Sequence, residues 1–148
     1  LKKVNSIAFG PGLGNNPRTL ELLKFVLENS DAPMVIDADG INVLAEEPAL
    51  LAKLKNRCIL TPHLGEFSRI SGLSIEEISK DRIKAAKDFS KKYSVILLLK
   101  GYNTIITNEC DVYVNTTGNS SMANGGMGDT LTGITASLIS QKYTILLH

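Results

Sequence analysis

The sequence lacks the charge excess, the long apolar runs and the targeting patterns that mark several classes of protein. Its 16 lysine and arginine residues nearly balance its 15 aspartate and glutamate residues. Bulk charge therefore gives no case for nucleic acid or an anionic membrane as a partner. The longest apolar run, residues 95–99, is much shorter than the ~20 residues that cross a bilayer. No secretory signal pattern is found, and we expect a cytoplasmic protein with no membrane contact.

Cysteine is scarce, and several catalytic signatures are missing. Cys58 and Cys110 are far apart and form no Cys-x-x-Cys arrangement, which argues against a zinc ribbon or a disulfide framework. We expect both to be reduced thiols, with Cys58 in the core because it opens an apolar run. Neither a Gly-x-x-x-x-Gly-Lys-Ser/Thr motif nor a Gly-x-Ser-x-Gly elbow occurs. This excludes a P-loop protein and leaves no support for a serine hydrolase.

Length and composition suit one domain. The chain has 148 residues, of which 43% are hydrophobic, enough to build a core. It begins with Leu1 rather than methionine and ends at His148 after an apolar run. We therefore expect a single domain over residues 1–148 that is truncated at both ends. A fragment of this kind can be inactive or prone to aggregation alone unless it assembles, which favours a homo-oligomer.

Short apolar runs alternate with helical patterns along the chain. Strands are predicted at residues 7–9, 34–36, 58–60, 94–99, 104–107 and 112–114. Helices are predicted from Asn16, with Pro17 in the first turn, at residues 48–55, 67–70 and 75–93, and after Gly128. This alternation predicts an α/β fold with a mostly parallel sheet and helices on its faces. The loops after the strands should then share one edge, where such folds bind ligands.

The helix predicted over residues 75–93 begins with a capping box, formed by Ser74 and by Glu77 three residues later. Its apolar side chains recur at helical spacing and are expected to be buried: Ile75, Ile78, Ala85, Ala86 and Phe89. Its lysines share the opposite side with acidic residues, so we interpret that side as solvated rather than as a phosphate-binding patch.

A glycine-rich loop leads into the last predicted helix. Gly125, Gly126 and Gly128 have no Cβ atom, so their backbone can approach a ligand closely and adopt positive φ. The free N–H groups and positive end of the helix favour an anion, above all a phosphate. Asp129 falls in the first turn, where its carboxylate could take a proton from a hydroxyl that attacks a phosphate. The alternative is that the glycines form only a turn and Asp129 only starts a helix.

A second candidate cluster follows the strand predicted to end at residue 99. Lys100 offers a cation suited to a nucleotide phosphate, and Gly101 leaves backbone room beside it. Asn103 and Thr104 could add hydrogen-bond donors. The alternative is a surface lysine before a turn.

His63 lies after another predicted strand, between Pro62 and Gly65. Pro62 restricts the backbone before His63 and Gly65 allows more freedom after it, which favours an imidazole presented to a ligand. A lone histidine can also be purely structural. No second histidine or cysteine stands at ligand spacing, so no metal site is predicted here. A carboxylate could still hold Mg²⁺ through water.

Asp37 and Asp39 follow the strand at residues 34–36 and point to the same side if the chain stays extended. They could bind magnesium through water, bind substrate hydroxyls, or cap the next helix. The glycine-rich loop at residues 10–14 is equally open between contact with an anion or substrate and a simple turn.

In combination these segments resemble one family. Gly-Pro-Gly-Leu-Gly at residues 10–14, Val-Ile-Asp-Ala-Asp-Gly-Ile-Asn at 35–42, Thr-Pro-His-Leu-Gly-Glu at 61–66, Leu-Lys-Gly at 99–101 and the loop from Gly118 to Asp129 follow one another in this order. The order is similar to that of the ADP- or ATP-dependent NAD(P)H-hydrate dehydratases. Pro-His-x-Gly-Glu and Gly-Gly-x-Gly-Asp are its most specific parts.

The resemblance implies a ribokinase-like, three-layer α/β/α fold and a repair activity. In this family a nucleotide phosphorylates the hydroxyl of hydrated NADH or NADPH, and loss of phosphate restores the nicotinamide ring. Mg²⁺ is the expected companion of the nucleotide, and ADP is weakly favoured over ATP by Met127 in the loop and by the lack of a targeting segment. Other interpretations remain: a ribokinase-like kinase for a sugar or vitamin precursor, or an inactive nucleotide-binding fragment.

The resemblance also implies roles for individual residues. Asp129 matches the catalytic base. The nucleotide-binding group comprises Lys100, Gly101, Asn103, Thr104, Gly125, Gly126 and Gly128. The substrate-binding group comprises Gly10, Gly12, Gly14, Asp39, Asn42, His63, Glu66 and Asn119.

Overall fold

Six strands form one sheet in the computed structural model, which describes residues 4–117 and 124–141. They are β1 (Ile7–Phe9), β2 (Met34–Ile36), β3 (Cys58–Leu60), β4 (Ile96–Leu99), β5 (Thr104–Thr107) and β6 (Val112–Asn115), and they lie in that order. Strands β1 to β4 pair in parallel, and β5 pairs antiparallel with both β4 and β6. All three side chains of β2 are fully buried, as expected of a parallel strand covered on both faces.

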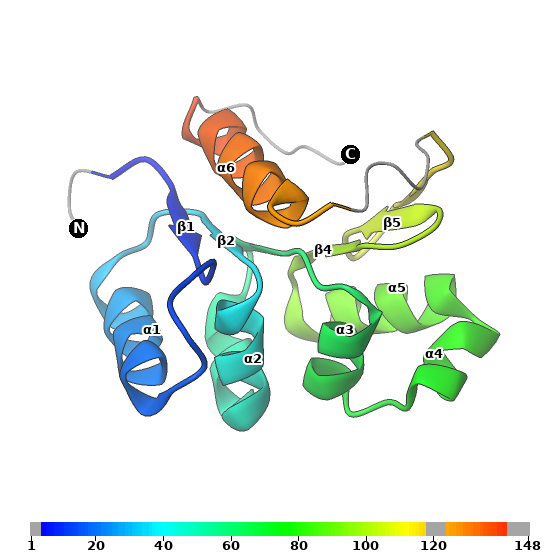
Figure 1. Ribbon diagram of the computed structural model, residues 1–148, viewed down its shortest axis with the longest axis horizontal. Helices are drawn as coiled ribbons and strands as arrows, with labels where there is room; N and C mark the ends of the chain where they lie inside the picture. The colour runs from blue at the N-terminus through cyan, green and yellow to red at the C-terminus, as the bar shows by residue number, and fades with distance from the viewer. Residues whose placement is uncertain (1–3, 118–123, 142–148) are drawn as a thin grey trace.

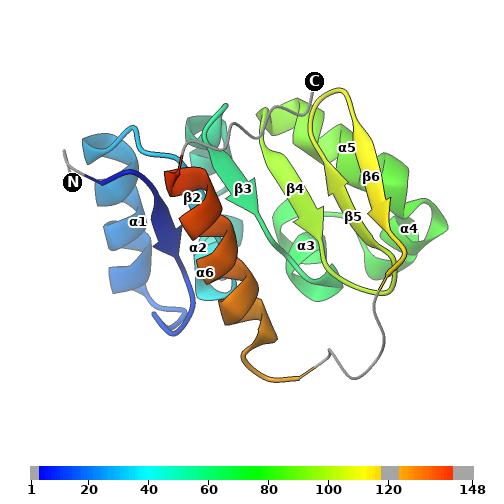
Figure 2. The same cartoon turned by 90° about the horizontal axis from the view of Figure 1, so that it is seen from above.

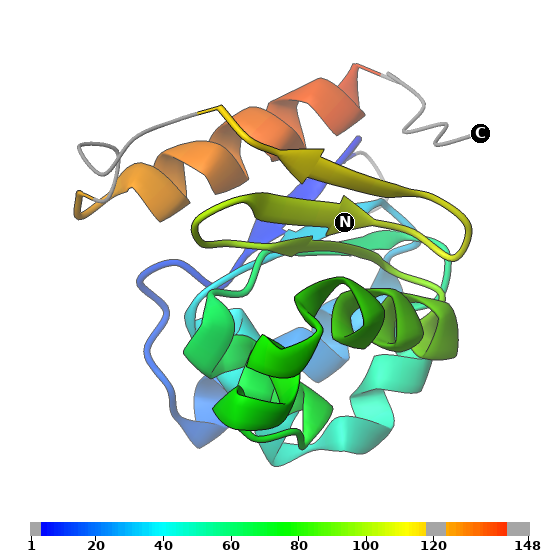
Figure 3. The same ribbon diagram turned by 90° about the vertical axis from the view of Figure 1, so that its right-hand side faces the viewer.

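Helices cover both faces of the sheet (Figure 1). On one face lie α1 (Pro17–Asn29), α2 (Asp39–Glu46), the 3-10 helix η1 (Pro48–Leu54), α3 (Leu64–Ser71), α4 (Ile75–Lys80) and α5 (Arg82–Tyr93). On the other face α6 (Met127–Ser140) runs across β1 and β2 (Figure 2). The view along the sheet shows the three layers (Figure 3). The predicted mostly parallel α/β sheet is therefore confirmed.

The two faces have unequal cores. The larger core lies between the sheet and the face covered by α1 to α5, and includes Leu23, Met34, Leu44 and Phe67. The smaller one packs Ala136 and Ile139 of α6 against side chains on the opposite face of the sheet. Among the residues placed in the structure, no helix is long and apolar enough to cross a membrane.

The prediction of helix α1 is confirmed in detail. Asn16 is the N-cap, and its side chain accepts hydrogen bonds from the amides of Arg18 and Thr19. Pro17 occupies the first helical position, where its missing N–H costs no hydrogen bond.

Two predictions about helices are wrong, and one helix was missed. The helix expected over residues 75–93 is two helices, because Asp81 leaves helical geometry and caps α5 through the Lys84 amide at 2.9 Å. Ile75, expected in the core, is 50% exposed at the start of α4. The helix expected at 48–55 is present as the 3-10 helix η1. Helix α2, which precedes it, was not predicted.

Candidate active site

The carboxyl ends of the four parallel strands meet at one edge, and the first turn of α6 lies over the same edge (Figure 2). Gly10 follows β1, Asp37 follows β2, and Lys100 follows β4. A Cβ atom built on Gly128 in α6 would lie 3.5 Å from Oδ2 of Asp37 and 3.6 Å from Nζ of Lys100. The structure thus brings polar groups from distant parts of the sequence to one place.

The centre of this site is the carboxylate of Asp37, which is 1% exposed. Its Oδ1 pairs with Nζ of Lys100 at 2.8 Å and also accepts the amide of Ala38. Its Oδ2 accepts a hydrogen bond from Oγ1 of Thr132 at 2.8 Å. These partners satisfy a charge that would otherwise be costly to bury. They also leave Asp37 less free to hold a magnesium-bound water than the sequence suggested.

Asp39 does not cap a helix through its side chain. It is the first residue of α2, and its Oδ2 accepts a hydrogen bond from the amide of Gly14 at 2.8 Å. Asp39 therefore holds the loop of residues 10–14 against the start of α2. That loop approaches Asp37 so closely that a Cβ on Gly10, where φ is 124°, would lie 1.8 Å from the Asp37 carbonyl oxygen. Gly12 and Gly14 in the same loop also have positive φ.

His63 and Glu66 form the N-terminal capping box of α3. Nδ1 of His63 accepts hydrogen bonds from the amides of Gly65 at 3.0 Å and Glu66 at 3.3 Å. Oε2 of the buried Glu66 accepts the amide of His63 at 2.8 Å, and Oε1 lies 3.4 Å from Nε2. The His63 side chain is 56% exposed, so it is both a structural cap and reachable by a ligand. The structural role is therefore confirmed, and contact with a ligand stays a prediction.

Asn42 has a partner that the sequence did not indicate. Its Oδ1 accepts hydrogen bonds from Nε and Nη2 of Arg69 at 3.2 and 2.9 Å. This fixes the orientation of the Asn42 amide between α2 and α3.

The predicted nucleotide-binding segment is the turn between β4 and β5. The amide of Lys100 donates to the carbonyl of Pro62 at 2.8 Å, which joins this turn to the end of β3. Gly101 has φ of 146° and Asn103 has φ of 56°, and Oγ1 of Thr104 donates to the Gly101 carbonyl.

Arg82 lies behind this turn, where a Cβ on Gly101 would come within 3.0 Å of its Nη2. Its Nη1 donates to the Tyr102 carbonyl at 2.7 Å. Arg82 is a second cation close to the predicted nucleotide segment that sequence reasoning missed, because it begins a helix that was expected to continue through it.

The glycine-rich loop reaches α6 as predicted. Gly126 is the N-cap, and it is the one described glycine of this loop that adopts the positive φ open to all three, at 83°. Asp129 is exposed in the first turn, next to the helix end that favours anions. The predicted substrate residue Asn119 and the adjoining Gly118 lie outside the described residues.

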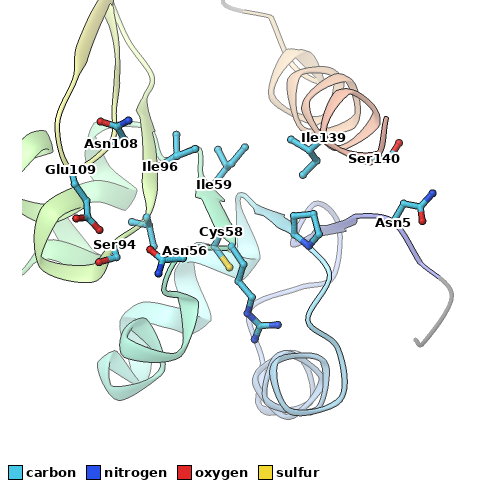
Figure 4. A pocket seen from close by; sticks show the side chains of 13 residues that line it. Asn5, Asn56, Cys58, Ile59, Ser94, Ile96, Asn108, Glu109, Ile139 and Ser140 are labelled. Carbon is cyan, nitrogen blue, oxygen red and sulfur yellow. The ribbon is translucent and has the colours of Figure 1, made fainter. Parts of the chain in front are cut away.

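A cavity of about 610 Å³ lies away from this edge (Figure 4). It is bounded by the starts of β3 and β4 and by the last turn of α6, with Cys58, Ile59, Ile96 and Ile139 in its wall. Most of its wall is apolar, and none of the residues named for the candidate site lines it. The polar strand-end cluster, not this cavity, is therefore the candidate for phosphate chemistry.

Comparison with known proteins identifies the family. A family model described as NAD(P)H-hydrate dehydratase matches residues 1–147. This chain belongs to the NAD(P)H-hydrate dehydratase family. It is 44% identical over 140 residues to a bifunctional NAD(P)H-hydrate repair enzyme of Coxiella burnetii, covering 94% of this chain and 28% of that protein.

Solved structures of similar proteins confirm the ribokinase-like fold expected of the family. The chain matches the Bacillus subtilis ADP/ATP-dependent NAD(P)H-hydrate dehydratase co-crystallised with ATP/Mg²⁺ at a TM-score of 0.78 and 32% identity, covering 95% of this chain and 49% of that one. It matches a ribokinase-like superfamily protein of Enterococcus faecalis at a TM-score of 0.83 and 31% identity, covering 93% of this chain and 48% of that one. The chain spans about half of each solved structure.

Proposed function

We propose that this chain carries out the nucleotide-dependent dehydration of NAD(P)H-hydrate, regenerating NADH or NADPH. Family membership supports the proposal, and one structural observation carries it. A lysine ammonium, the start of a helix and an exposed carboxylate gather at one sheet edge, around Lys100, Gly128 and Asp129. The cation and the helix start can bind a phosphate, and the carboxylate can act as a general base.

The reaction has two steps. The hydroxyl of the hydrate attacks the terminal phosphate of the nucleotide, its proton passes to Asp129, and the shortened nucleotide leaves. Phosphate then departs from the ring carbon with the electrons of the C–O bond, and a proton lost from the neighbouring carbon restores the double bond. Phosphate transfer of this kind depends mainly on positioning and charge neutralisation.

The other predicted residues take binding roles in this proposal. Nucleotide phosphates are bound by Lys100, by the turn of Gly101, Asn103 and Thr104, and by Gly125, Gly126 and Gly128. The hydrate is bound by the loop of Gly10, Gly12 and Gly14 with Asp39, by Asn42, by His63 and Glu66, and by Asn119. In support, Asp39 accepts a hydrogen bond from the Gly14 amide and so holds the loop of residues 10–14 in place. Arg69 in turn fixes the side-chain amide of Asn42.

The residues at this edge fit Mg²⁺ carried by a nucleotide. The described part of the chain contains no group of three or more His, Cys, Asp or Glu side chains that could hold a metal alone. Mg²⁺ commonly keeps several waters and uses one or two carboxylates together with substrate phosphates, and exposed Asp129 could supply a carboxylate of this kind. When bound, Mg²⁺ neutralises charge on the phosphates.

We also propose which nucleotide donates the phosphate and where in the cell the reaction takes place. We place ADP ahead of ATP as phosphate donor and the activity in the cytoplasm, as the sequence suggested.

A homo-oligomer is proposed because Ile134 and Leu138 on the outer side of α6 are 55% and 48% exposed, and burial of such side chains favours association. Light scattering would measure the assembly, and a monomer at all concentrations would contradict it.

The test of the proposed function is recovery of reduced nicotinamide absorbance from NADH-hydrate with ADP or ATP and Mg²⁺. Wild-type protein should restore the absorbance. The Asp129→Asn variant should lose at least ~100-fold in kcat, because removing the base removes general base catalysis, while its dissociation constant for ADP measured without Mg²⁺ changes little. Retained turnover in Asp129→Asn would remove Asp129 as the base.

A further inference from the structure

Asp37 joins three parts of the candidate site that are far apart in the sequence. It follows β2, Lys100 follows β4, and Thr132 lies in α6. The two side-chain contacts of Asp37 span 63 and 95 residues, and each is 2.8 Å long. Both partners use different oxygens of the same carboxylate, so the carboxylate fixes their separation.

The first contact fixes a flexible cation. The lysine side chain has four rotatable bonds, so its ammonium samples many positions unless a partner holds it in one. Because Asp37 is buried, its charge requires a close cation, and this holds the Lys100 ammonium beside the start of α6. The Lys100 side chain remains 24% exposed, so the ammonium can still be reached by a phosphate.

The second contact fixes the angle of rotation of α6. Thr132 is 1% exposed, and its hydroxyl donates to the carboxylate. Residues three apart in a helix share a side, so the bond that holds Thr132 also sets the direction of Asp129. The far half of α6 is held separately, by the hydroxyl of Ser6 donating to the Ala136 carbonyl at 2.8 Å.

We propose that Asp37 is a positioning residue. It fixes the position of the Lys100 ammonium relative to the side of α6 that carries Asp129. It acts through its two partners and does not touch the reacting atoms. This inference rests on the proposed function, because it assigns to one carboxylate the geometry that phosphate transfer requires.

Steady-state kinetics on the full-length protein tests the two contacts separately. Thr132→Val removes the hydroxyl with little change in shape, and it should lower kcat by ~10- to 100-fold through misplacement of Asp129, with the KM for ADP within about twofold, since Lys100 stays paired. Asp37→Asn should lower kcat similarly and also raise the KM for ADP by ~10-fold, because Lys100 loses its charged partner. Asp31→Asn, an exposed residue before β2, should change neither constant.

The double variant distinguishes positioning from general destabilisation. If Thr132 acts through Asp37, adding Thr132→Val to Asp37→Asn should cost little more in kcat. Losses that multiply, or a Thr132→Val variant with wild-type kcat, would overturn the inference. A role in folding alone would lower the melting temperature and leave kcat per folded molecule and the KM for ADP unchanged, which would also overturn it.

Hydrogen exchange gives a reading that does not depend on activity. The amides of Thr130 and Leu131 should exchange faster in Thr132→Val than in wild type, whereas Asp31→Asn should match wild type. If the wild-type protein restores no NADH from its hydrate, the proposed function fails. The exchange rates still test the positioning role of Asp37 in that case. Exchange in α6 that is the same in Thr132→Val as in wild type would contradict this role.

Discussion

A Cβ on Gly128 would lie 3.6 Å from the Lys100 ammonium, so in the proposed site a side chain at residue 128 would cover part of the cation that binds phosphate. A Cβ there would make ordinary contacts of 3.5 and 3.6 Å, and alanine favours a helix over glycine by up to ~1 kcal/mol. We therefore predict that Gly128→Ala keeps or raises the melting temperature and raises the dissociation constant for ADP by ~10-fold or more, since it covers a charged phosphate partner.

The matched control for this substitution is Gly133→Ala. Gly133 is exposed in the same helix, and a Cβ there meets nothing within 4 Å. It should raise the melting temperature and leave ADP binding unchanged. Unchanged ADP affinity in Gly128→Ala as well, measured by calorimetry, would show that the phosphate does not approach Lys100 across this glycine.

The two cysteines differ in reactivity for a reason visible at single residues. Cys110 is exposed, whereas Cys58 is buried, and burial raises the pKa of its thiol to about 12 despite the nearby Arg57. Only a thiolate attacks a disulfide reagent readily. We predict that Cys110 reacts quickly in the native protein and that Cys58 reacts only after denaturation, as measured by thiol titration. Equal rates for both would contradict the burial.

The raised pKa also predicts a pH dependence of stability. In the unfolded chain the Cys58 thiol ionises near its ordinary pKa of ~8.5, while in the fold it stays neutral until about 12. Its contribution to the free energy of unfolding is therefore complete below the unfolded pKa and is lost as pH rises towards 12. Cys58→Ala should weaken this alkaline dependence in denaturant titrations.

At the scale of elements, helix α3 is capped by a histidine that is also a predicted substrate-binding residue. His63→Ala removes both the cap and the imidazole, and losing a cap costs about 1 kcal/mol. His63→Asn keeps an acceptor for the Gly65 and Glu66 amides. We predict a lower melting temperature for His63→Ala alone, and a raised KM for the hydrate in both variants with little change in the KM for ADP. Hydrate binding restored in His63→Asn would show that the imidazole is only a cap.

The sequence predicted those elements whose signals are local. Continuous apolar runs identified the six strands, and Asn16 with Pro17 identified the start of α1. Helix α2 was missed because Asp-Ala-Asp-Gly is typical of a loop. There Ala38 has φ of 47° and Gly40 packs closely on Phe9 and Ile36, so tertiary contact sets the helix start.

The inner side of α6 and the links within the site could not be predicted from local pattern. Leu131, Ile134, Leu138 and Ile139 recur at helical spacing, yet Ile134 and Leu138 are exposed and Thr132 is buried. Thr132 is buried because Asp37, 95 residues earlier, accepts its hydroxyl. The strand order placed Asp37 and Lys100 at one edge in advance, but only the folded chain pairs their charges.

At the scale of the whole molecule, the four parallel strands, which lie within the first 99 residues, and α6 from the last part of the chain meet at the same edge. The candidate site therefore requires the complete path from β1 to α6, and it lies within about half the length of the solved relatives. Loops from four strands contribute, so a change at one strand end affects the position of groups from the others.

The most direct test of the account compares released phosphate with restored reduced nicotinamide, starting from NADH-hydrate, ADP and Mg²⁺. A dehydratase that phosphorylates and then eliminates should release about one phosphate for each NADH formed, because the same phosphate is added and removed. Stable phosphorylated hydrate with no NADH would contradict the account and indicate a small-molecule kinase. Bound ADP with neither product would indicate a nucleotide-binding chain without turnover.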